Sequence, residues 1–477
     1  MLFPSFLYIL VFLPVVVLGA ILLRNTLGYK AAQAGVLLAS FVFYGKSNPF
    51  GLIYLVASII ANWLFAHLIA RTPPPRKKHI LVTALVLNML YLCVFKYLAF
   101  FASIVTFALP RGYHVPTIGF VLGISFFTIT QIMYLVDCYE DTLTPGTLFD
   151  HASFVAFFPY LISGPLGRAK RIRHQFPHMG GQDDSRATTM ARGVFIFSLG
   201  LFKKTIFGDA FAQVVTYGNT TATHTSALEA WIFSIAYALY LYFDFGGYTD
   251  MAIGSALMLG IDIPRNFDAP YSSKSIIEFW QRWHISLTNF ITTYLFTPIF
   301  RSFKNRTLFA STVATFIAMG IAGLWHGGAW TYVVYGLLHG TYLGVNQYWR
   351  KKNMPKIPIF LSWLLTFVAV VIAQVYFQAA SMHAANARVL NMFNPHHAFT
   401  LANVTSFGFT INGFGMRLAI WPLLLGAGVA FFGPSSEQRA RDFRPTRLNC
   451  AYAVGLTIVS LVVINSVISA PFVYFKF

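Results

Sequence analysis

Residues 320–330, GIAGLWHGGAW, place one histidine between two apolar runs that are each long enough to cross a bilayer. An ionisable ring at such a depth is costly, and it is a functional candidate by default. His326 is followed by Gly327 and Gly328, which lack a Cβ and let a ligand or another backbone approach the ring. An apolar setting favours neutral imidazole, the form that accepts a proton as a general base. The structural alternative for His326 is capping of helix-end carbonyls or a place at the membrane interface.

A second candidate, His284, lies in SIIEFWQRWHISL (275–287), a segment that predicts an amphipathic helix. At 100° per residue, Glu278 and Arg282 share one face and can form an ion pair. Trp280 and His284 share another face, which could form a cavity wall. The alternative is an interfacial helix with its aromatic rings among the lipid headgroups.

Charged side chains inside apolar segments form a third group. Asp244 and Asp250 straddle a glycine pair that we expect to break the helix. A carboxylate there could orient an imidazole or hold a polar substrate, whereas Asp250 could instead cap a helix that begins near Thr249. We expect Lys203 and Lys204 to extend to the inner membrane surface.

The other histidines give weaker signals. His339 follows His326 by thirteen residues, which points it to nearly the opposite side of a continuous helix, so we expect it to pack rather than react. His174 and His178 lie in a basic loop with a proline between them, and His396 follows a proline in a polar loop. The three cysteines are scattered and no HExxH or CxxC pattern is present, so no metal site is predicted.

The composition indicates a membrane protein. Of 477 residues, 57% are hydrophobic and 10% are charged, whereas soluble domains carry about a quarter charged residues. The net charge of +19 comes from basic residues in short loops between apolar runs. This is the pattern of positive-inside topology and argues against a nucleic-acid partner.

We therefore predict an all-α polytopic membrane protein with roughly eleven to thirteen transmembrane or re-entrant helices, since a span needs about 20 residues. Its single integral-membrane domain, 1–477, would comprise N-terminal spans (1–110), a catalytic core (118–347) and C-terminal spans (357–477). The apolar runs lie near 3–23, 31–45, 50–70, 79–95, 118–137, 193–213, 227–243, 307–324, 329–347, 357–378, 416–433 and 449–470, with further candidates at 97–109 and 151–165.

The basic loops predict an orientation. With the N-terminus outside, loops 24–30 and 71–78 lie inside. The hairpin 307–347 begins and ends at basic loops, so its tip should face outward or lie at membrane depth. Segment 244–300 is too polar for a simple spanning helix and too aromatic for a loop. We expect it to be buried and to line a cavity, because irregular backbone at membrane depth must be covered.

Taken together, these residues resemble the membrane-bound O-acyltransferase family, in its bacterial alginate O-acetylase-like branch. The similarity covers about two-thirds of the chain. The matching stretches are GISFFTITQIMYLVDCYE (123–140), FVAFFPYLISGPLGRAK (154–170), GLFKKTIFGD (200–209), YLYFDFGGYTDMAIG (240–254), PRNFDAPYSSKSIIEFWQRWHISL (264–287) and GLWHGGAWTYVVYGLLHG (323–340).

The resemblance implies a fold with a central tunnel and two marked histidines, His284 and His326, of which His326 is the more critical. Asp244, Trp325, Gly327, Trp280 and Asn266 are the substrate-binding or orienting candidates. Two departures from the family pattern leave the acceptor open. An Arg-Asp pair is replaced by Thr292 and Thr293, and a Gly-Gly pair by Phe300 and Arg301.

The resemblance further implies that an acyl group, which we expect to be acetyl, passes from a cytoplasmic donor to a periplasmic or cell-surface acceptor. The donor would be acetyl-CoA or a carrier-protein thioester. The acceptor side would be a polysaccharide or a periplasmic SGNH-type acetyltransferase partner, and the location the bacterial cytoplasmic (inner) membrane. No bound cofactor is expected, because a thioester is already activated.

In the expected mechanism, His326 takes the proton of the acceptor hydroxyl as that oxygen attacks the thioester carbonyl. Backbone amides near Gly327 and Gly328, or the His284 ring, would stabilise the oxyanion. Transfer of D-alanine from a carrier protein to teichoic acid is the alternative within enzymes. A proton-coupled transporter or flippase is the alternative of another class, which the absence of inverted halves in the sequence disfavours.

Overall fold

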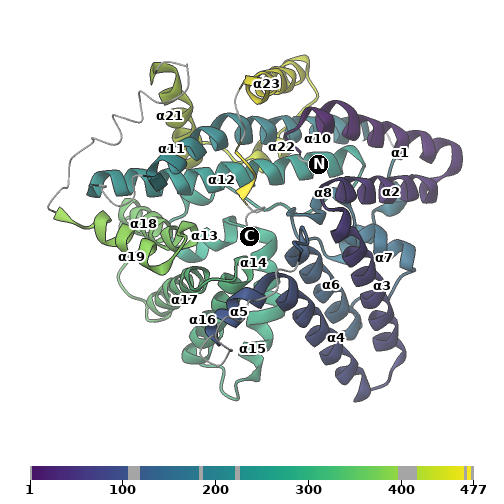
Figure 1. The fold of residues 1–477 in the computed structure, drawn as a ribbon, viewed down its shortest axis with the longest axis horizontal. Coiled ribbons are helices and arrows are strands. Elements are labelled where there is room, and N and C mark those ends of the chain that lie inside the picture. Colours follow the sequence, from purple (N-terminus) through teal and green to yellow (C-terminus); the bar gives the residue numbers. More distant parts are fainter. Residues whose placement is uncertain are drawn as a thin grey trace, which may run out of the picture. The chain divides into compact units, whose positions relative to one another are not determined.

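A computed structural model describes residues 3–105, 119–181, 186–220, 226–395, 416–466 and 470–473. These residues form helices joined by short loops (Figure 1). Within this part of the chain, seven helices are long and apolar enough to cross a membrane, so the prediction of an all-α polytopic membrane protein is confirmed. They are Leu7–Leu27, Pro49–Arg71, Arg76–Ile104, Ala227–Met258, Leu308–His326, Ile359–Gln378 and Arg447–Asn465.

The chain folds into two compact units, each assembled from separated segments. The first unit comprises Met1–Leu199, Tyr248–Arg265 and Phe443–Gly455, and the second comprises Gly200–Gly247, Asn266–Asp442 and Leu456–Phe477. Three helices, α10 (Arg186–Phe202), α12 (Ala227–Met258) and α23 (Arg447–Ser466), contribute residues to both units.

In the first unit, hydrogen bonds between buried polar side chains join the long helices. Asn62 and Asn88 exchange side-chain hydrogen bonds of 3.2 and 2.7 Å, and Gln131 Nε2 donates to Ser58 Oγ at 2.8 Å. Such bonds hold membrane helices together, where the hydrophobic effect between helices is weak. The helices are η1 (Leu7–Phe12), α1 (Leu13–Leu27), α2 (Tyr29–Ser47), α3 (Pro49–Arg71), α4 (Arg76–Leu92), η2 (Cys93–Tyr97), α5 (Leu98–Ile104), α6 (Ile124–Tyr139), α7 (Leu148–Val155), α8 (Phe158–Leu161), α9 (Ala169–Arg173) and η4 (Phe176–His178).

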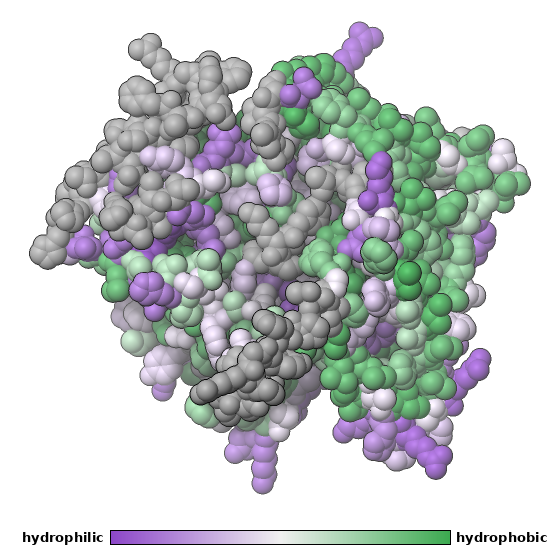
Figure 2. Space-filling view, viewed as in Figure 1, coloured by the Kyte–Doolittle hydropathy of each residue, from purple (hydrophilic) through white to green (hydrophobic). Residues whose placement is uncertain are grey.

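The outer surface of these N-terminal helices is apolar. Figure 2 shows hydrophobic side chains over much of the region of α1 to α4, with hydrophilic residues gathered at its lower end. Leu18, Leu38 and Ile53 are 62, 66 and 68% exposed. Large apolar side chains that are exposed in such numbers on spanning helices indicate a lipid-facing surface.

The second unit carries the candidate site. Its helices are η5 (Lys203–Gly208), α11 (Asp209–Thr220), the first part of α12, η7 (Pro270–Ser272), α13 (Ile276–Arg282), α14 (Ile285–Phe290), η8 (Ile291–Phe296), α15 (Thr297–Ser302), α16 (Leu308–His326), α17 (Trp330–Lys351), α18 (Ile359–Gln378), α19 (Met382–Met392), α21 (Met416–Phe432) and α22 (Ser436–Arg441).

The hairpin of α16 and α17 is packed through glycines. A Cβ at Gly323 would lie 2.3 Å from Tyr332 O, and one at Gly336 would lie 2.2 Å from Met319 O. The two backbones therefore approach each other more closely than any larger residue would allow. This close packing fixes the hairpin that we predicted over 307–347.

The predicted break at the glycine pair is wrong, because α12 continues through it to Met258. A Cβ on Gly247 would lie 2.6 Å from Gly200 O, so this glycine permits α12 to approach the backbone of α10 closely. Asp250 consequently lies in the helix interior rather than at a cap. The polar region that we predicted from residue 244 begins after Met258.

Candidate active site

His284 lies at a break in the chain rather than on a helix face. Segment 275–287 is not the single helix that we predicted, since α13 ends at Arg282 and α14 begins at Ile285. His284 joins them with a φ of 44°, a left-handed conformation that is uncommon outside glycine and clusters at functional sites. The predicted ion pair between Glu278 and Arg282 is confirmed at 2.8 Å.

Asn266 holds this turn from the preceding loop. Its side-chain Oδ1 accepts hydrogen bonds from Ser286 N (3.1 Å), Ser286 Oγ (2.7 Å) and His284 Nδ1 (3.2 Å). Its backbone oxygen accepts from Ile285 N at 2.9 Å. These bonds compensate for the strained conformation of His284 and explain why the helix breaks there.

The same contacts fix the proton position on His284. The Ser286 amide can only donate, so the Asn266 atom that faces it is the oxygen, and His284 Nδ1 must donate to that oxygen. The proton of the neutral ring is therefore on Nδ1, and Nε2 has a bare lone pair with no hydrogen-bond partner among the described residues. Burial lowers the pKa of His284 to about 3, so the ring is neutral at physiological pH.

Trp325 brings the two predicted histidines into one cluster. Its ring centroid lies 4.9 Å from that of His326 and 6.4 Å from that of His284. His326, at the end of α16, is 4% exposed and also contacts Phe377. Two histidines 42 positions apart in the sequence thus both contact one indole ring.

Gly327 has a packing role that differs from our prediction. A Cβ at this position would lie 2.2 Å from the Tyr332 ring, so the missing side chain makes room for Tyr332. Its amide donates to Leu324 O at 3.1 Å and is therefore occupied. Of the two amides that we considered as oxyanion donors, that of Gly328 makes no backbone hydrogen bond in the described part of the chain.

His339 belongs to the same cluster, although we expected it to point away. The chain reverses between α16 and α17, so the geometry of a continuous helix does not apply. Tyr335 contacts both histidines, with ring centroids 6.1 Å from His326 and 4.7 Å from His339. The i,i+4 spacing of Tyr335 and His339 on α17 was the sequence signal for this contact.

Trp280 fixes the proton position on His339. Its Nε1 donates to His339 Nδ1 at 3.3 Å. An indole N–H cannot accept, so Nδ1 is the acceptor and the proton of the neutral ring is on Nε2. That N–H is buried and has no hydrogen-bond partner among the described residues. Trp280 therefore faces His339 rather than sharing a surface with His284.

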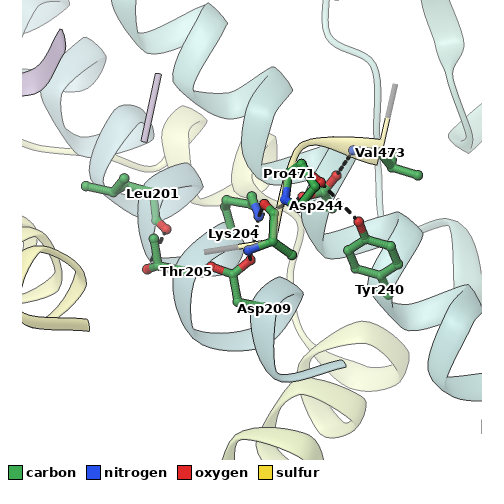
Figure 3. A network of polar contacts seen from close by, with 9 residues as sticks. Leu201, Lys204, Thr205, Asp209, Tyr240, Asp244, Pro471 and Val473 are labelled. Atoms are coloured by element: carbon green, nitrogen blue, oxygen red, sulfur yellow. Dashed lines mark hydrogen bonds and ion pairs between the residues drawn. The ribbon is translucent and has the colours of Figure 1, made fainter. Parts of the chain in front are cut away.

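Asp244 belongs to a buried ion network that binds the C-terminal segment 470–473 (Figure 3). Lys204 Nζ lies 3.0 Å from Asp244 Oδ1 and also donates to Asp209. Asp244 Oδ2 accepts from Val473 N at 2.8 Å, and Asp209 Oδ1 accepts from Ala470 N at 3.2 Å. Lys204 is 2% exposed, so our expectation that it reaches the membrane surface is wrong.

The network is connected to His284 through two phenylalanine rings. Phe245, next to Asp244 on α12, lies edge-on to the His284 ring at 4.9 Å, and Phe472 packs against Phe245 at 6.1 Å. Sequence reasoning missed the network because it joins residues that are more than 260 positions apart. The sequence signals were the charged residues Lys204, Asp209 and Asp244 within apolar segments.

The fold and this cluster define a class of protein. Residues 139–385 match the model of MBOAT, the membrane-bound O-acyltransferase family, and the chain belongs to that family. It is therefore a multi-pass membrane enzyme that transfers acyl groups to hydroxyls.

Relatives with assigned functions place it in the branch that we predicted. The chain is 37% identical over 424 residues to the peptidoglycan O-acetyltransferase of Helicobacter pylori, covering 81% of this chain and 78% of the relative. It is 34% identical over 399 residues to the "Probable alginate O-acetylase AlgI" of Pseudomonas aeruginosa (81% and 73%). It is also 30% identical over 253 residues to the teichoic acid D-alanyltransferase of Bacillus subtilis (51% and 63%).

Proposed function

We propose that this protein transfers an acetyl group from a cytoplasmic thioester to a hydroxyl of a cell-surface glycan, directly or through a periplasmic SGNH-type partner protein. The proposal is carried by one observation: two buried histidines, His284 and His326, both contact the Trp325 ring. A cluster of this kind can position a hydroxyl, take its proton and exclude water.

His326 is the general base. Its neutral imidazole takes the proton of the acceptor hydroxyl while the hydroxyl oxygen attacks the thioester carbonyl. The tetrahedral intermediate then expels the thiolate, which receives that proton from the His326 imidazolium. The oxygen–carbon bond of the ester forms and the carbon–sulfur bond breaks, so no metal or redox group takes part.

His284 accepts a hydrogen bond during this reaction. Because its Nδ1 proton is bound to Asn266, the bare Nε2 cannot stabilise an oxyanion. It can accept a hydrogen bond from the hydroxyl and hold it in line for attack. The oxyanion needs donors, and the Gly328 amide and His339 Nε2–H are two candidates in the described cluster.

Two features support transfer outward across the bacterial inner membrane. Basic residues flank the α16–α17 hairpin at 301–306 and 350–356, which puts those ends inside by the positive-inside rule. His326 at the hairpin tip then lies toward the outer side, where a surface acceptor arrives.

Acetyl is favoured over D-alanyl because the O-acetyltransferase relatives match over more of the chain. The similarity to the D-alanyltransferase of B. subtilis covers 51% of it, whereas that to the H. pylori O-acetyltransferase covers 81%. D-alanyl transfer remains the second candidate, and both donors are included in the test.

The test uses the full-length protein in lipid nanodiscs with radiolabelled acetyl-CoA or a D-alanyl carrier thioester. Peptidoglycan fragments, alginate and a periplasmic partner serve as acceptors. We expect an acetyl ester on the acceptor, and a loss of 10²- to 10⁴-fold in the His326→Ala protein, which is the range for removal of a general base.

His174→Ala is the matched control, because His174 is an exposed histidine in a basic loop and its replacement should leave the rate unchanged. Equal activity of the His326→Ala protein, or transfer of D-alanine alone, would overturn the proposal.

A further inference from the structure

Arg388 is an isolated charge in a long segment of the chain that lies on the outer side. Residues 379–415 contain no other Asp, Glu, Lys or Arg, and residues 217–228 contain none. The longer segment follows α18, which starts just after the basic loop 350–356 and ends at Gln378. Since the positive-inside rule puts that loop in the cytoplasm, it puts the end of α18 on the outer side. The rule predicts few cations there, so Arg388 needs another explanation.

The described partners of Arg388 are all neutral. Its Nη2 donates to Gly218 O at 3.0 Å and to Asn219 Oδ1 at 3.4 Å, and its Nη1 donates to Gln378 Oε1 at 3.4 Å. No carboxylate in the described part of the chain forms an ion pair with it. These three bonds leave two of its five N–H donors without an acceptor among the described residues.

The plain alternative is that Arg388 caps α11. Gly218 and Asn219 lie in the last turn of that helix, where a cation is favourable. Capping accounts for the two Nη2 bonds. It does not account for a half-buried charge that also reaches α18, since burial lowers the pKa of Arg388 and therefore disfavours its charged form. An anionic ligand would offset that cost.

The helix that carries Arg388 is held at two further points. Tyr376 Oη on α18 donates to Asn386 Oδ1 at 3.0 Å, and Trp231 Nε1 on α12 donates to Met392 O at 2.9 Å. Helices α18 and α19 lie side by side (Figure 1). The guanidinium is thus fixed in place, which reduces the entropy that is lost when it binds a ligand.

Arg388 lies at the outer edge of the histidine cluster. Gln378, which accepts from Arg388, directly follows Phe377, whose ring lies 5.1 Å from that of His326. Arg388, Phe377 and His326 all belong to the second unit. A group bound to Arg388 is therefore on the side of the cluster from which a surface acceptor arrives.

We infer that Arg388 recognises the acceptor by binding a carboxylate group of an acidic glycan. The guanidinium would form charge-assisted hydrogen bonds with the carboxylate, and the side-chain amides of Asn219 and Gln378 would bind hydroxyls of the sugar. One hydroxyl of the bound glycan would then be directed toward His326. This inference rests on the proposed function and assigns the residue that selects its acceptor.

The test uses the full-length protein in lipid nanodiscs and two acceptors, a muramic acid disaccharide and a mannuronate oligomer. Each is supplied with its carboxylates free or converted to amides. With the free acid that is acetylated, Arg388→Gln should raise the acceptor KM about 10-fold, the lower end for loss of a hydrogen bond to a charged group. The kcat and the KM for acetyl-CoA should change little. Amidation should raise the KM of the wild type to a similar extent, and Arg388→Gln should then add nothing.

Two further variants separate recognition from folding. Arg388→Lys keeps the charge and should recover part of the lost affinity, whereas Arg306→Gln removes an exposed arginine from the inner loop 301–306 and should leave the acceptor KM unchanged. A lower Tm in Arg388→Gln with equal effects on free and amidated acceptors would overturn the inference, because a helix cap would then suffice. Dependence on Arg388 with a periplasmic partner protein as acceptor, but with neither glycan, would also overturn it and would identify a contact with the partner.

Equilibrium binding of the two acids distinguishes this inference from the proposed function. The His326→Ala protein should bind an acid as tightly as the wild type does while losing transfer, and Arg388→Gln should bind it about 10-fold more weakly. Binding that does not depend on Arg388, or no binding of either acid, would overturn the inference even where transfer depends on His326. Normal transfer by the His326→Ala protein would overturn the proposed function, and binding that depends on Arg388 would still support the recognition site.

Discussion

Two buried histidines of the second unit differ in what their Nε2 atoms can do: one is a hydrogen-bond acceptor and the other a hydrogen-bond donor. His284, in the turn between α13 and α14, has its proton on Nδ1 toward Asn266 and a bare lone pair on Nε2. His339, in the middle of α17, accepts from Trp280 on Nδ1 and has an unpaired N–H on Nε2. Both side chains are almost completely buried, at 1% and 0% exposure.

The difference shows that burial alone does not define the function of a histidine. The neighbour on Nδ1 decides what Nε2 can do: an amide oxygen leaves an acceptor, and an indole N–H leaves a donor. In acyl transfer both are needed, because the attacking hydroxyl requires an acceptor and the developing oxyanion requires a donor.

The largest expected effect concerns the ion network of Lys204, Asp209 and Asp244, which reaches His284 through Phe245. Lys204→Met would leave two buried carboxylates without their cation, and breaking a buried ion pair in this way costs about 3–5 kcal/mol. We expect a lower Tm and release of the C-terminal segment, measured by thermal unfolding and by limited proteolysis. Lys78→Met, which removes an exposed lysine, should leave the Tm unchanged.

The charge balance of the network can be tested in the same assay. Combining Lys204→Met with Asp209→Asn and Asp244→Asn removes the unpaired charges and should restore part of the lost stability. If the triple variant is no more stable than Lys204→Met, the network does not act through its charges.

A matched pair of substitutions tests the two histidines directly. His284→Leu removes the acceptor and should lower kcat/KM about 100-fold, which is about 2.7 kcal/mol, whereas His284→Gln supplies a carbonyl acceptor and should lose less. At His339, Gln supplies an N–H donor in place of Nε2–H and should again be better tolerated than Leu. Equal losses for Gln and Leu at either position would contradict the assigned role.

The sequence predicted the membrane class, because composition is a local property, and the family resemblance singled out His284 and His326. It could not predict the features that depend on contacts distant in the chain. The glycine pair at 246–247 predicts a helix break, whereas α12 continues through it and Gly247 makes a close contact with Gly200. Lys204 is buried because its partners come from α12 and residue 470, which no local pattern indicates.

His284 and His339 show the same limit at the level of the site. A helical wheel placed His284 beside Trp280, but Asn266 bends the chain at His284 and Trp280 faces His339 instead. The proton positions follow from hydrogen-bond partners 18 and 59 residues away. The spacing of residues within one segment therefore cannot predict them.

The pH dependence gives the next test of the comparison. Because burial lowers the pKa of His284 to about 3, its Nε2 stays available at neutral and mildly acidic pH. Asn266→Asp would put a carboxylate beside Nδ1–H and favour the imidazolium, which raises the pKa. Protonated Nε2 cannot accept, so activity in this variant should fall as the pH decreases through the raised pKa.

The measurement is the pH profile of kcat/KM from pH 5 to 8 for the wild type and Asn266→Asp. In the variant, kcat/KM should fall toward acid pH within this range. In the wild type, this fall should be absent or should occur at lower pH. Asn353→Asp, at an exposed asparagine of a basic loop, is the control for added negative charge. A variant profile that coincides with that of the wild type would mean that His284 does not act as an acceptor.

The smallest expected effect is at Trp280, on the His339 side. Trp280→Phe removes the N–H that fixes the His339 tautomer and keeps an aromatic ring in place. The loss of one buried hydrogen bond is about 0.5–1.5 kcal/mol, so we expect a 2- to 10-fold lower kcat with an unchanged KM for acetyl-CoA. Without the indole N–H, His339 can also place its proton on Nδ1 and present a bare Nε2, which explains why kcat rather than binding should change.

The effect should disappear in a His339→Gln background, because glutamine has no tautomer to fix. An equal loss in both backgrounds would mean that Trp280 acts by packing alone.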